Sequence, residues 1–226
     1  MSVYAISDLH LPAHQKPMDI FGPHWENHFE RISESWRESV TDDDTVLIPG
    51  DITWAMRLED ALDDLNRIGA LPGKKIISRG NHDYWWDGIG KVRRSLPDGM
   101  FALQNDAIVM DGVIFAGTRG WVLPAGESDT DNMKIFTRER LRLEMSLTTA
   151  RRIGGDLPLC VMLHYPPFMG ANDGFCDILK AFGADHCVYG HLHGGALQFA
   201  FNGERDGIMY HQVSCDGLGF KVRFLF

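Results

Sequence analysis

Five short polar motifs, each directly after an apolar run of strand character, constrain this chain more than any other feature of its sequence. They are Asp-Leu-His at 8–10, Gly-Asp at 50–51, Gly-Asn-His-Asp at 80–83, a single histidine at 164, and Gly-His-Leu-His at 190–193. In an open α/β sheet, ligands bind outside the carboxyl ends of the strands. Although the motifs are far apart in the sequence, their placement predicts that they converge at one edge of the fold.

The residue types in these motifs are those that bind divalent transition metals, because imidazole, carboxylate and amide oxygen occur together. The candidate ligands are Asp8, His10, Asp51, Asn81, His164, His191 and His193. Glycine precedes three of them and allows the backbone to turn tightly there. Each motif alone is a weak signal, since a Gly-Asp pair is usually only a turn. The ordered combination, which contains no cysteine, favours an open metal site over a closed structural zinc centre.

Short apolar runs alternate with amphipathic segments over most of the chain, which is typical of an α/β protein. We predict strands at 3–7, 45–49, 75–78, 107–110, 113–117, 159–164, 186–189, 197–201, 209–214 and 221–226. We predict helices at 24–39, 58–69, 86–95, 134–152 and 173–182. The helix from Lys134 is the longest, and Gly154-Gly155 is expected to end it. From Leu197 onward the pattern changes to strands and turns, with Asn202-Gly203 as the predicted hairpin turn.

Composition limits the class of partner. The chain has 226 residues and a net charge of −9, with no basic patch or tail, which argues against stable nucleic-acid binding. A phosphate substrate is still compatible with this charge, because bound metal cations would dominate the local field. Four cysteines without a Cys-x-x-Cys pair are expected to be buried, reduced thiols, which suits a reducing cytosol. With no signal peptide and no apolar run of about 20 residues, we expect a cytoplasmic protein that does not enter the membrane.

The ordered motifs resemble those of the calcineurin-like metallophosphoesterase superfamily. The resemblance runs from Asp8 to His193, which is most of the chain, and all five motifs are intact. It implies an α/β sandwich of two mixed β-sheets packed face to face and flanked by helices. We expect a single domain over 1–226, with room for a helical or loop insertion at 120–157.

The resemblance also implies a role for each matching residue. Asp8, His10 and His193 would hold one metal ion, Asn81, His164 and His191 a second, and Asp51 would bridge the two. The implied reaction is hydrolysis of a phosphate mono- or diester by a hydroxide that bridges the metals, with His82 as general acid and Asp51 as the second catalytic residue. Asn81 and His82 would contact the substrate, with Arg79 as a weaker candidate. For Asp83 a helix cap is favoured over the orientation of His82.

Several alternatives stay open at this level. Mixed His, carboxylate and amide ligation suits Mn, Fe, Zn, Co or Ni and does not choose among them. The same fold could serve as a non-catalytic metal-binding scaffold, although the complete ligand set and His82 argue against this. The substrate is a phosphate ester and could be a nucleotide. The oligomeric state cannot be read from the sequence.

For aromatic and histidine residues outside the ligand set, a structural role is favoured over contact with substrate or metal. Trp54 and the run Tyr84-Trp85-Trp86 could stack on a flat substrate group, but packing of a helix onto the sheet is favoured. The role of the loop at 120–131 is also open. Five further histidines are expected to be structural or solvated, namely His14, His24, His28, His186 and His211.

Overall fold

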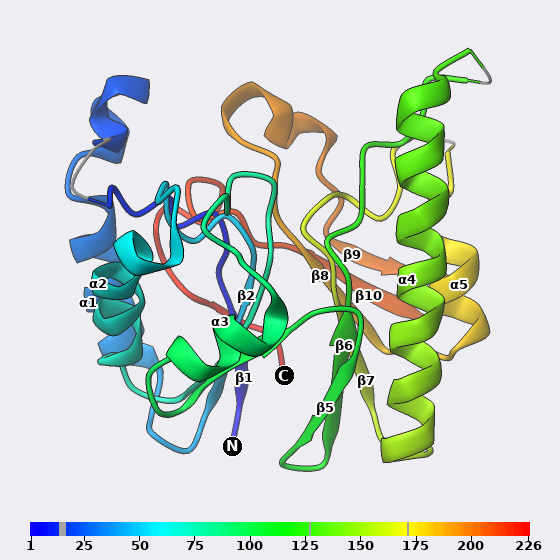
Figure 1. Ribbon diagram of the computed structural model, residues 1–226, viewed down its shortest axis with the longest axis horizontal. Coiled ribbons are helices and arrows are strands. Elements are labelled where there is room, and N and C mark those ends of the chain that lie inside the picture. Colours follow the sequence, from blue (N-terminus) through cyan, green and yellow to red (C-terminus); the bar gives the residue numbers. More distant parts are fainter. Residues whose placement is uncertain (14–16, 127, 171) are drawn as a thin grey trace.

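The structure, a computed structural model, describes residues 1–13, 17–126, 128–170 and 172–226. Two β-sheets lie face to face at its centre, and helices cover the outer face of each sheet (Figure 1). The first sheet has the strand order β11-β1-β2-β3-β4, and the second has the order β5-β6-β7-β8-β10-β9. The predicted sandwich of two mixed sheets is confirmed.

The strands are β1 Val3–Ala5, β2 Thr45–Pro49, β3 Lys74–Ser78, β4 Met100–Leu103, β5 Ala107–Met110, β6 Val113–Gly117, β7 Leu159–Met162, β8 His186–Tyr189, β9 Gly203–Arg205, β10 Ile208–Gln212 and β11 Arg223–Phe224. The α-helices are α1 His28–Ser39, α2 Leu58–Gly69, α3 Ile89–Ser95, α4 Thr130–Gly154 and α5 Cys176–Ala181. Three 3₁₀ helices are η1 Met18–Phe21, η2 Pro23–Trp25 and η3 Gly194–Phe199.

The strands that carry the motifs form the parallel centre of each sheet. β1, β2, β3 and β4 pair in parallel in the first sheet, and β6, β7, β8 and β10 in the second. Every residue of β2 and of β7 is buried, which is why these strands are continuous runs of apolar side chains rather than alternating ones. Parallel pairing within each sheet brings the carboxyl ends of its strands to one edge.

Three layers of apolar side chains hold the sheets and helices together. Trp36 and Leu65 pack helices onto the first sheet, Leu143 and Leu147 pack α4 onto the second, and Phe115 lies in the layer between the sheets. Full burial of one such side chain stabilises the fold by about 1.5–3 kcal/mol before entropy is counted. The two sheets also join through the backbone, because Ser7 N donates to Val213 O at 2.8 Å and Cys215 N donates to Ser7 O at 3.0 Å.

Most predicted elements are present, with shifted ends. α1 begins at His28 rather than at residue 24, because Asn27 has a left-handed backbone with φ 51° and separates it from η2. α3 begins at Ile89 rather than at residue 86, directly after Gly88. Gly155 ends α4 as expected, with a backbone N–H that bonds to Arg151 O.

The C-terminal third contains the clear errors. The predicted strand at 197–201 is wrong, because Gly194–Phe199 forms a 3₁₀ helix with bonds such as Ala196 N to His193 O. The predicted hairpin turn at Asn202-Gly203 is also wrong. The turn between β9 and β10 is Asp206-Gly207, whose φ values of 55° and 80° suit a tight type I′ turn.

The short strand β4 was not predicted. It follows the turn-rich segment Leu96–Gly99 and has only four residues, Met100–Leu103, so its pattern is too short to stand out. All four cysteines are buried and free, as expected. Among the described residues, no helix is both long enough and apolar enough to cross a membrane.

Candidate metal centre

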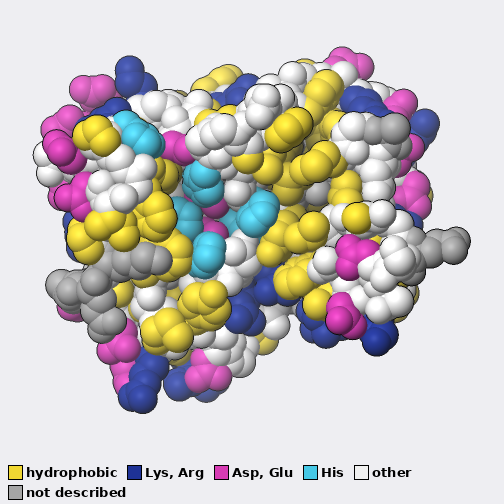
Figure 2. Space-filling view, turned by 90° about the horizontal axis from the view of Figure 1, so that it is seen from above, with side chains coloured by type: hydrophobic (Ala, Val, Ile, Leu, Met, Phe, Trp, Pro, Cys, Tyr) yellow, Lys and Arg dark blue, Asp and Glu magenta, His cyan; other side chains and the backbone are white. Residues whose placement is uncertain are grey.

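The predicted ligands come together where the strands of both sheets end. Seen from above, several histidine side chains surround a hollow with carboxylates at its base (Figure 2). Two groups of side chains in it have atoms close enough to share a metal ion. The first is Asp8, His10 and His193, and the second is Asp8, Asp51 and His164.

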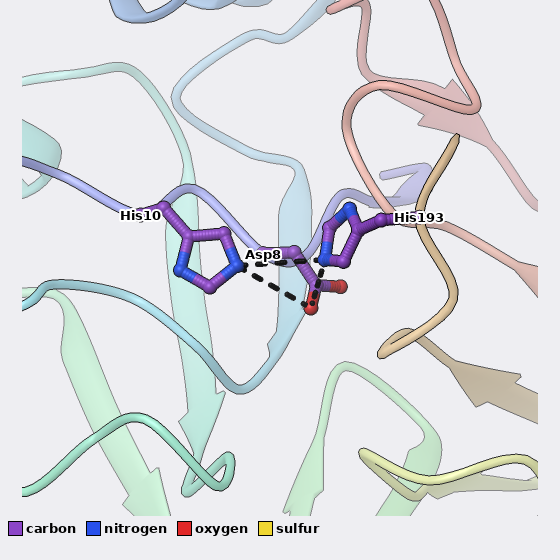
Figure 3. A group of neighbouring side chains, drawn as sticks. All are labelled: Asp8, His10 and His193. Carbon is purple, nitrogen blue, oxygen red and sulfur yellow. Dashed lines mark hydrogen bonds and ion pairs between the residues drawn. The ribbon is translucent and has the colours of Figure 1, made fainter. Parts of the chain in front are cut away.

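In the first group, two imidazoles point at one carboxylate (Figure 3). His193 Nε2 lies 3.1 Å from Asp8 Oδ1, and His10 Nε2 lies 4.0 Å from the same oxygen. The two Nε2 atoms are 3.4 Å from each other. This arrangement of one carboxylate and two ring nitrogens around a common point suits a divalent cation.

Asp8 is fixed by its other oxygen. Asp8 Oδ2 accepts hydrogen bonds from the hydroxyls of Ser7 and Ser214, the latter at 2.9 Å, and from His191 N at 3.1 Å. The carboxylate therefore cannot rotate freely, and Oδ1 stays directed at the imidazoles. Partners of this kind behind a metal ligand orient it and adjust its basicity.

In the second group, His164 also lies close to two further predicted ligands, Asn81 and His191. Its Nδ1 lies 3.0 Å from Pro49 O, and its Nε2 lies 2.7 Å from Asn81 Oδ1. His191 Nδ1 lies 2.9 Å from the same amide oxygen. A histidine that binds a metal usually donates its other N–H to a carbonyl or a carboxylate, and Pro49 O is placed for this.

Asp51, a member of the second group, also faces His10 of the first group. Its Oδ2 is 3.8 Å from His10 Nε2 on one side and 3.4 Å from His164 Nε2 on the other. Its Oδ1 accepts a hydrogen bond from His82 N at 2.8 Å. The geometry places Asp51 where a bridging carboxylate would be needed.

Unusual backbone conformations coincide with the ligands. Asp8, His10, Asp51 and His191 have φ values of 57°, 45°, 52° and 72°. Side-chain-bearing residues rarely adopt this left-handed region, and each such residue costs of order 1–3 kcal/mol. This strain turns four side chains inward at the strand ends and is typical of functional sites.

At two positions only glycine fits, because a neighbouring carboxylate lies where a Cβ atom would be. A Cβ on Gly80 would lie 2.1 Å from Asp51 Oδ1, and one on Gly190 would lie 2.3 Å from Asp8 Oδ2. Glycine at these two positions therefore makes room for the carboxylates themselves.

Protonation differs among the four imidazoles. Burial lowers the pKa of both His10 and His191 to about 4, so each keeps a lone pair free at pH 7. Burial also acts against the charged form of His164 and His193, but Asp51 raises the pKa of His164 to about 9. Hydrogen bonds to Asp216 and Asp8 raise the pKa of His193 to about 10.

Opposing effects also act on the carboxylates. Burial favours the neutral form of Asp51, but the nearby His164 lowers its pKa to about 2. Protons on His164 and His193 thus balance the negative charges of this cluster. A divalent cation would take over that role and displace the protons, as expected of a metal site. The donor set and its charge fit bound divalent metal ions.

His82 lines the wall of a cavity beside these ligands. The cavity has a volume of about 330 Å³ and is also lined by His10, Asp51, His191 and His193. The ring of His82 lies 4.6 Å from that of Trp54, which in turn stacks on His10 at 4.8 Å. His82 is in neither group of candidate ligands, as expected.

Asp83 has a different role from the one favoured by its sequence. It caps no helix, since α3 begins only at Ile89. Its fully buried carboxylate accepts hydrogen bonds from Asp51 N at 2.8 Å, Ile52 N at 2.9 Å and Gly80 N at 2.7 Å. Burial and the charge of Asp51 raise its pKa to about 6. Asp83 therefore ties the Gly-Asp loop to the Gly-Asn-His-Asp loop.

The aromatic residues divide into two kinds. Trp85 and Trp86 are buried in the first core, as the packing interpretation predicted. Trp54 is only half-buried and lines the cavity with the apolar side chains of Met18, Phe21 and Trp25. Arg79 does not line this cavity but a neighbouring one.

Among the described histidines outside the motifs, only His24, an exposed residue, lines the cavity. His28 bonds to Leu9 O at 2.8 Å, and His186 pairs with His211 at 3.1 Å. His14 lies outside the described residues.

The sequence analysis missed Asp216. Its Oδ1 lies 2.9 Å from His193 Nδ1, and its Oδ2 accepts a hydrogen bond from Gly194 N at 2.9 Å. Asp216 thus holds the ring that presents Nε2 to Asp8. A signal was present, because Asp216 follows a predicted strand, as Asp51 does, but it belongs to none of the five motifs.

Comparison with known proteins gives a family and a fold. A family model described as calcineurin-like phosphoesterase matches residues 1–195. No curated protein matches the sequence of the chain. A crystal structure of a protein of unknown function, AQ665 from Aquifex aeolicus, is 18% identical and has a TM-score of 0.51. The alignment covers 99% of this chain and 95% of that one, so the two share a fold.

A second solved structure, described as a novel archaeal phosphodiesterase, is 17% identical, with a TM-score of 0.44. The alignment covers 96% of this chain and 86% of that one.

Proposed function

Because the chain belongs to the calcineurin-like phosphoesterase family, we propose that it hydrolyses a phosphate mono- or diester with two divalent metal ions. The observation that carries the proposal is the position of Asp51, whose Oδ2 lies between His10 and His164 at 3.8 and 3.4 Å. A carboxylate oxygen that faces proposed ligands of both ions is the arrangement that a two-metal site needs.

In this proposal, Asp8, His10 and His193 hold one ion, Asn81, His164 and His191 hold the other, and Asp51 contacts both. Bound at these positions, divalent cations such as Mn, Fe, Zn, Co or Ni would supply Lewis acidity, offset charge on the phosphoryl oxygens and lower the pKa of water. Asp83 and Asp216, which are not ligands, keep Asp51 and His193 in position.

His82 acts as the general acid. Hydrolysis in line with the leaving group needs a proton donor beside the departing oxygen. His82 lines the cavity next to the ligands, and its backbone N–H is held by Asp51 Oδ1 at 2.8 Å. Contact with Trp54 at 4.6 Å limits the positions open to the ring.

The apolar wall of the cavity favours a substrate with a flat organic group. Trp25 and Trp54 supply large rings, and Met18 and Phe21 add further apolar surface. Such walls bury the organic part of a ligand, while a few polar groups fix its orientation. A nucleotide fits this description, with the base or an aryl group against the wall and the phosphoryl group at the ligands.

The test is hydrolysis of p-nitrophenyl phosphate and bis(p-nitrophenyl) phosphate by metal-stripped protein with Mn added back. We expect turnover of at least one ester that depends on added metal. Faster cleavage of the diester would assign a phosphodiesterase, and faster cleavage of the monoester a phosphatase. Tight binding of two metal ions without turnover of either ester or of a nucleotide panel would favour the alternative, a non-catalytic metal-binding scaffold.

A further inference from the structure

A second cavity, of about 250 Å³, opens at the same ends of the strands as the metal centre. We call it the arginine pocket. Its walls come from the ends of β3, β4 and β6 and from one side of α4. The residues that line it are Ser78, Arg79, Leu103, Gln104, Asn105, Thr118, Arg119, Arg138, Glu139 and Arg142.

The pocket concentrates positive charge in a chain that is otherwise acidic. Four guanidinium groups line it against one carboxylate, so its formal charge is +3, whereas the whole chain carries −9. Figure 2 shows Lys or Arg side chains next to the histidine cluster on this face. Like charges in one cavity repel each other, so an arrangement of this kind suits an anionic ligand.

The single carboxylate is already satisfied. Glu139 is buried, lies 2.6 Å from Arg142 Nη1 and accepts a hydrogen bond from the Thr118 hydroxyl at 2.7 Å. Arg138 Nε lies 3.8 Å from it. In the described part of the chain, no carboxylate lies within 4.0 Å of the guanidinium of Arg79 or Arg119. Arg119 lies instead over the ring of Trp121, at 4.6 Å.

Two buried donors in the pocket have no hydrogen-bond partner among the described residues. They are Ser78 Oγ and Arg79 Nε, which are neighbours in the sequence. Ser78 is 1% exposed, so bulk water cannot supply the missing partner. A buried donor without a partner costs about 1–3 kcal/mol, and native structures contain few of them. Ser78 and Arg79 are both among the residues that line this pocket, so the two donors lie beside the place where an oxyanion would bind.

The pocket shares its loops with the metal centre. Arg79 is two residues before Asn81. Arg119 O accepts hydrogen bonds from His164 N at 2.9 Å and Tyr165 N at 3.1 Å. A ligand held by these arginines therefore lies next to the loops that carry Asn81 and His164.

We propose that the arginine pocket binds a phosphoryl group, either a second one carried by the substrate or free phosphate. A phosphoryl group offers several oxygens that accept charge-assisted hydrogen bonds, and guanidinium groups match their geometry. The substrate-borne case rests on the proposed function, and binding of free phosphate does not.

The first test measures binding alone. Inorganic phosphate is titrated calorimetrically into metal-free protein and into the variants Arg119→Gln, Arg138→Gln and Arg152→Gln. Arg152 is exposed on the same helix, α4, and does not line the pocket, so it controls for the loss of one charge. We expect phosphate binding to weaken about tenfold or more in the first two variants, because each of them removes a charged donor from the pocket. Binding should not weaken in the third, whose arginine lies outside the pocket.

The second test identifies the source of the phosphoryl group. The substrates are thymidine 5′-(p-nitrophenyl phosphate) and its 3′-phosphorylated form, which release the same product and differ only in the second phosphoryl group. If the substrate carries the group, the 3′-phosphorylated ester has the lower KM, and Arg119→Gln abolishes the difference. If the pocket takes free phosphate, the two esters have equal KM, and added phosphate changes both rates in the wild type but not in Arg119→Gln.

Two results would overturn the proposal. One is wild-type protein that binds no phosphate, and the other is phosphate binding that is equally strong in Arg119→Gln, Arg138→Gln and Arg152→Gln. Failure of the proposed function looks different, because neither these two diesters nor p-nitrophenyl phosphate would be hydrolysed while the phosphate titration would still distinguish the variants.

Discussion

At the scale of single residues, the hydrogen-bond partners behind the candidate ligands decide which ligand atom faces the centre. His164 and His193 each present Nε2 to the centre because the other ring nitrogen faces Pro49 O or Asp216. Asp8 has one oxygen held by hydroxyls and a backbone N–H, and the other directed at the imidazoles. These candidate ligands are thus held in position by hydrogen-bond partners behind them, as metal ligands usually are.

The general-acid role of His82 predicts that His82→Ala keeps both metal ions but loses turnover. The loss should be about 10²–10⁴-fold on an alkyl phosphate ester, whose leaving group needs a proton. It should be smaller on a p-nitrophenyl ester, whose leaving group departs unaided. Steady-state kinetics with both esters, alongside elemental analysis for bound metal, checks this. Equal activity of variant and wild type on the alkyl ester would rule out the role.

Asp216 should act through His193. In Asp216→Asn the hydrogen bond to Gly194 N can remain, but the charge that orients His193 and raises its basicity is lost. We expect metal affinity to fall about 10–100-fold at one of the two sites. Competition with a chelating dye measures this, with the exposed Asp206→Asn as the control. Unchanged affinity at both sites would show that Asp216 is not needed to orient the ring.

At the scale of elements, each motif follows the end of a strand, and the motifs at 8–10, 50–51 and 190–193 contain side-chain-bearing residues with a left-handed backbone. The loop after β2 and the loop after β3 are so close that Asp83 on one accepts from Asp51 N and Ile52 N on the other. Such proximity leaves no space for a side chain at Gly80. Local sequence and long-range packing are therefore inseparable at this point of the fold.

Gly80→Ala tests this close approach. The added Cβ would lie 2.1 Å from Asp51 Oδ1 and 2.3 Å from Asp51 N, so the two loops must separate. We expect a loss of more than about 2 kcal/mol in the free energy of unfolding, together with loss of metal binding. Gly88→Ala is the matched control, because no atom lies within 4 Å of the added Cβ. Similar denaturation midpoints for the two variants would refute the steric argument.

A pair of histidines on neighbouring strands predicts a pH dependence. Burial, with Arg223 and His186, lowers the pKa of His211 on β10 to about 4, and burial lowers that of His186 on β8. The unfolded chain therefore binds more protons than the folded one between pH 6.5 and about 4, so stability falls as the pH drops through this window. For His211 the full effect corresponds to about 3 kcal/mol.

The variant that tests this is His211→Phe. The rings of His211 and His186 are stacked with centroids 5.3 Å apart, and phenylalanine keeps a ring at this position but cannot titrate. We expect the melting temperature of the variant to fall less steeply than that of the wild type between pH 7 and pH 4.5. The exposed His24→Gln serves as the control. Parallel curves of melting temperature against pH for His211→Phe and wild type would mean that this pair does not contribute to the pH dependence of stability.

At the scale of the whole molecule, the metal centre joins the two sheets. Asp8, His10, Asp51 and Asn81 follow strands of the first sheet, whereas His164, His191 and His193 follow strands of the second. Both sheets also contribute to the arginine pocket, whose walls come from the ends of β3 and β4 in the first sheet and of β6 in the second. A ligand at either place would therefore contact both sheets of the sandwich.

Metal should therefore stabilise the whole fold. At a free concentration about 100 times the dissociation constant, a bound ion adds about 2.7 kcal/mol to the free energy of unfolding. We expect Mn to raise the melting temperature of the stripped protein and a chelator to reverse this. Asp51→Asn, which removes the shared carboxylate, should lose most of the increase. An undiminished increase in Asp51→Asn would exclude the bridging role of this residue.

The class of fold and the candidate ligands could be predicted from local sequence patterns. Parallel strands buried on both faces need continuous apolar runs, and chemistry at their ends needs polar residues there, so both leave local patterns. The motifs at 8–10, 50–51, 80–83, 164 and 190–193 could be read for this reason. The ends of α1 and α3 could be read only to within a few residues, because caps and left-handed turns set them.

The contacts between these motifs depend on how distant parts of the chain pack together. Asp216 and Asp83 act through partners 23 and 32 residues away in the sequence, and no local pattern records such contacts. The arginine pocket exists because three loops and one helix meet, although Arg119 and Arg138 look like ordinary surface residues in the sequence. Periodicity reports which face of an element is buried, whereas the partner across a gap depends on how the two sheets pack.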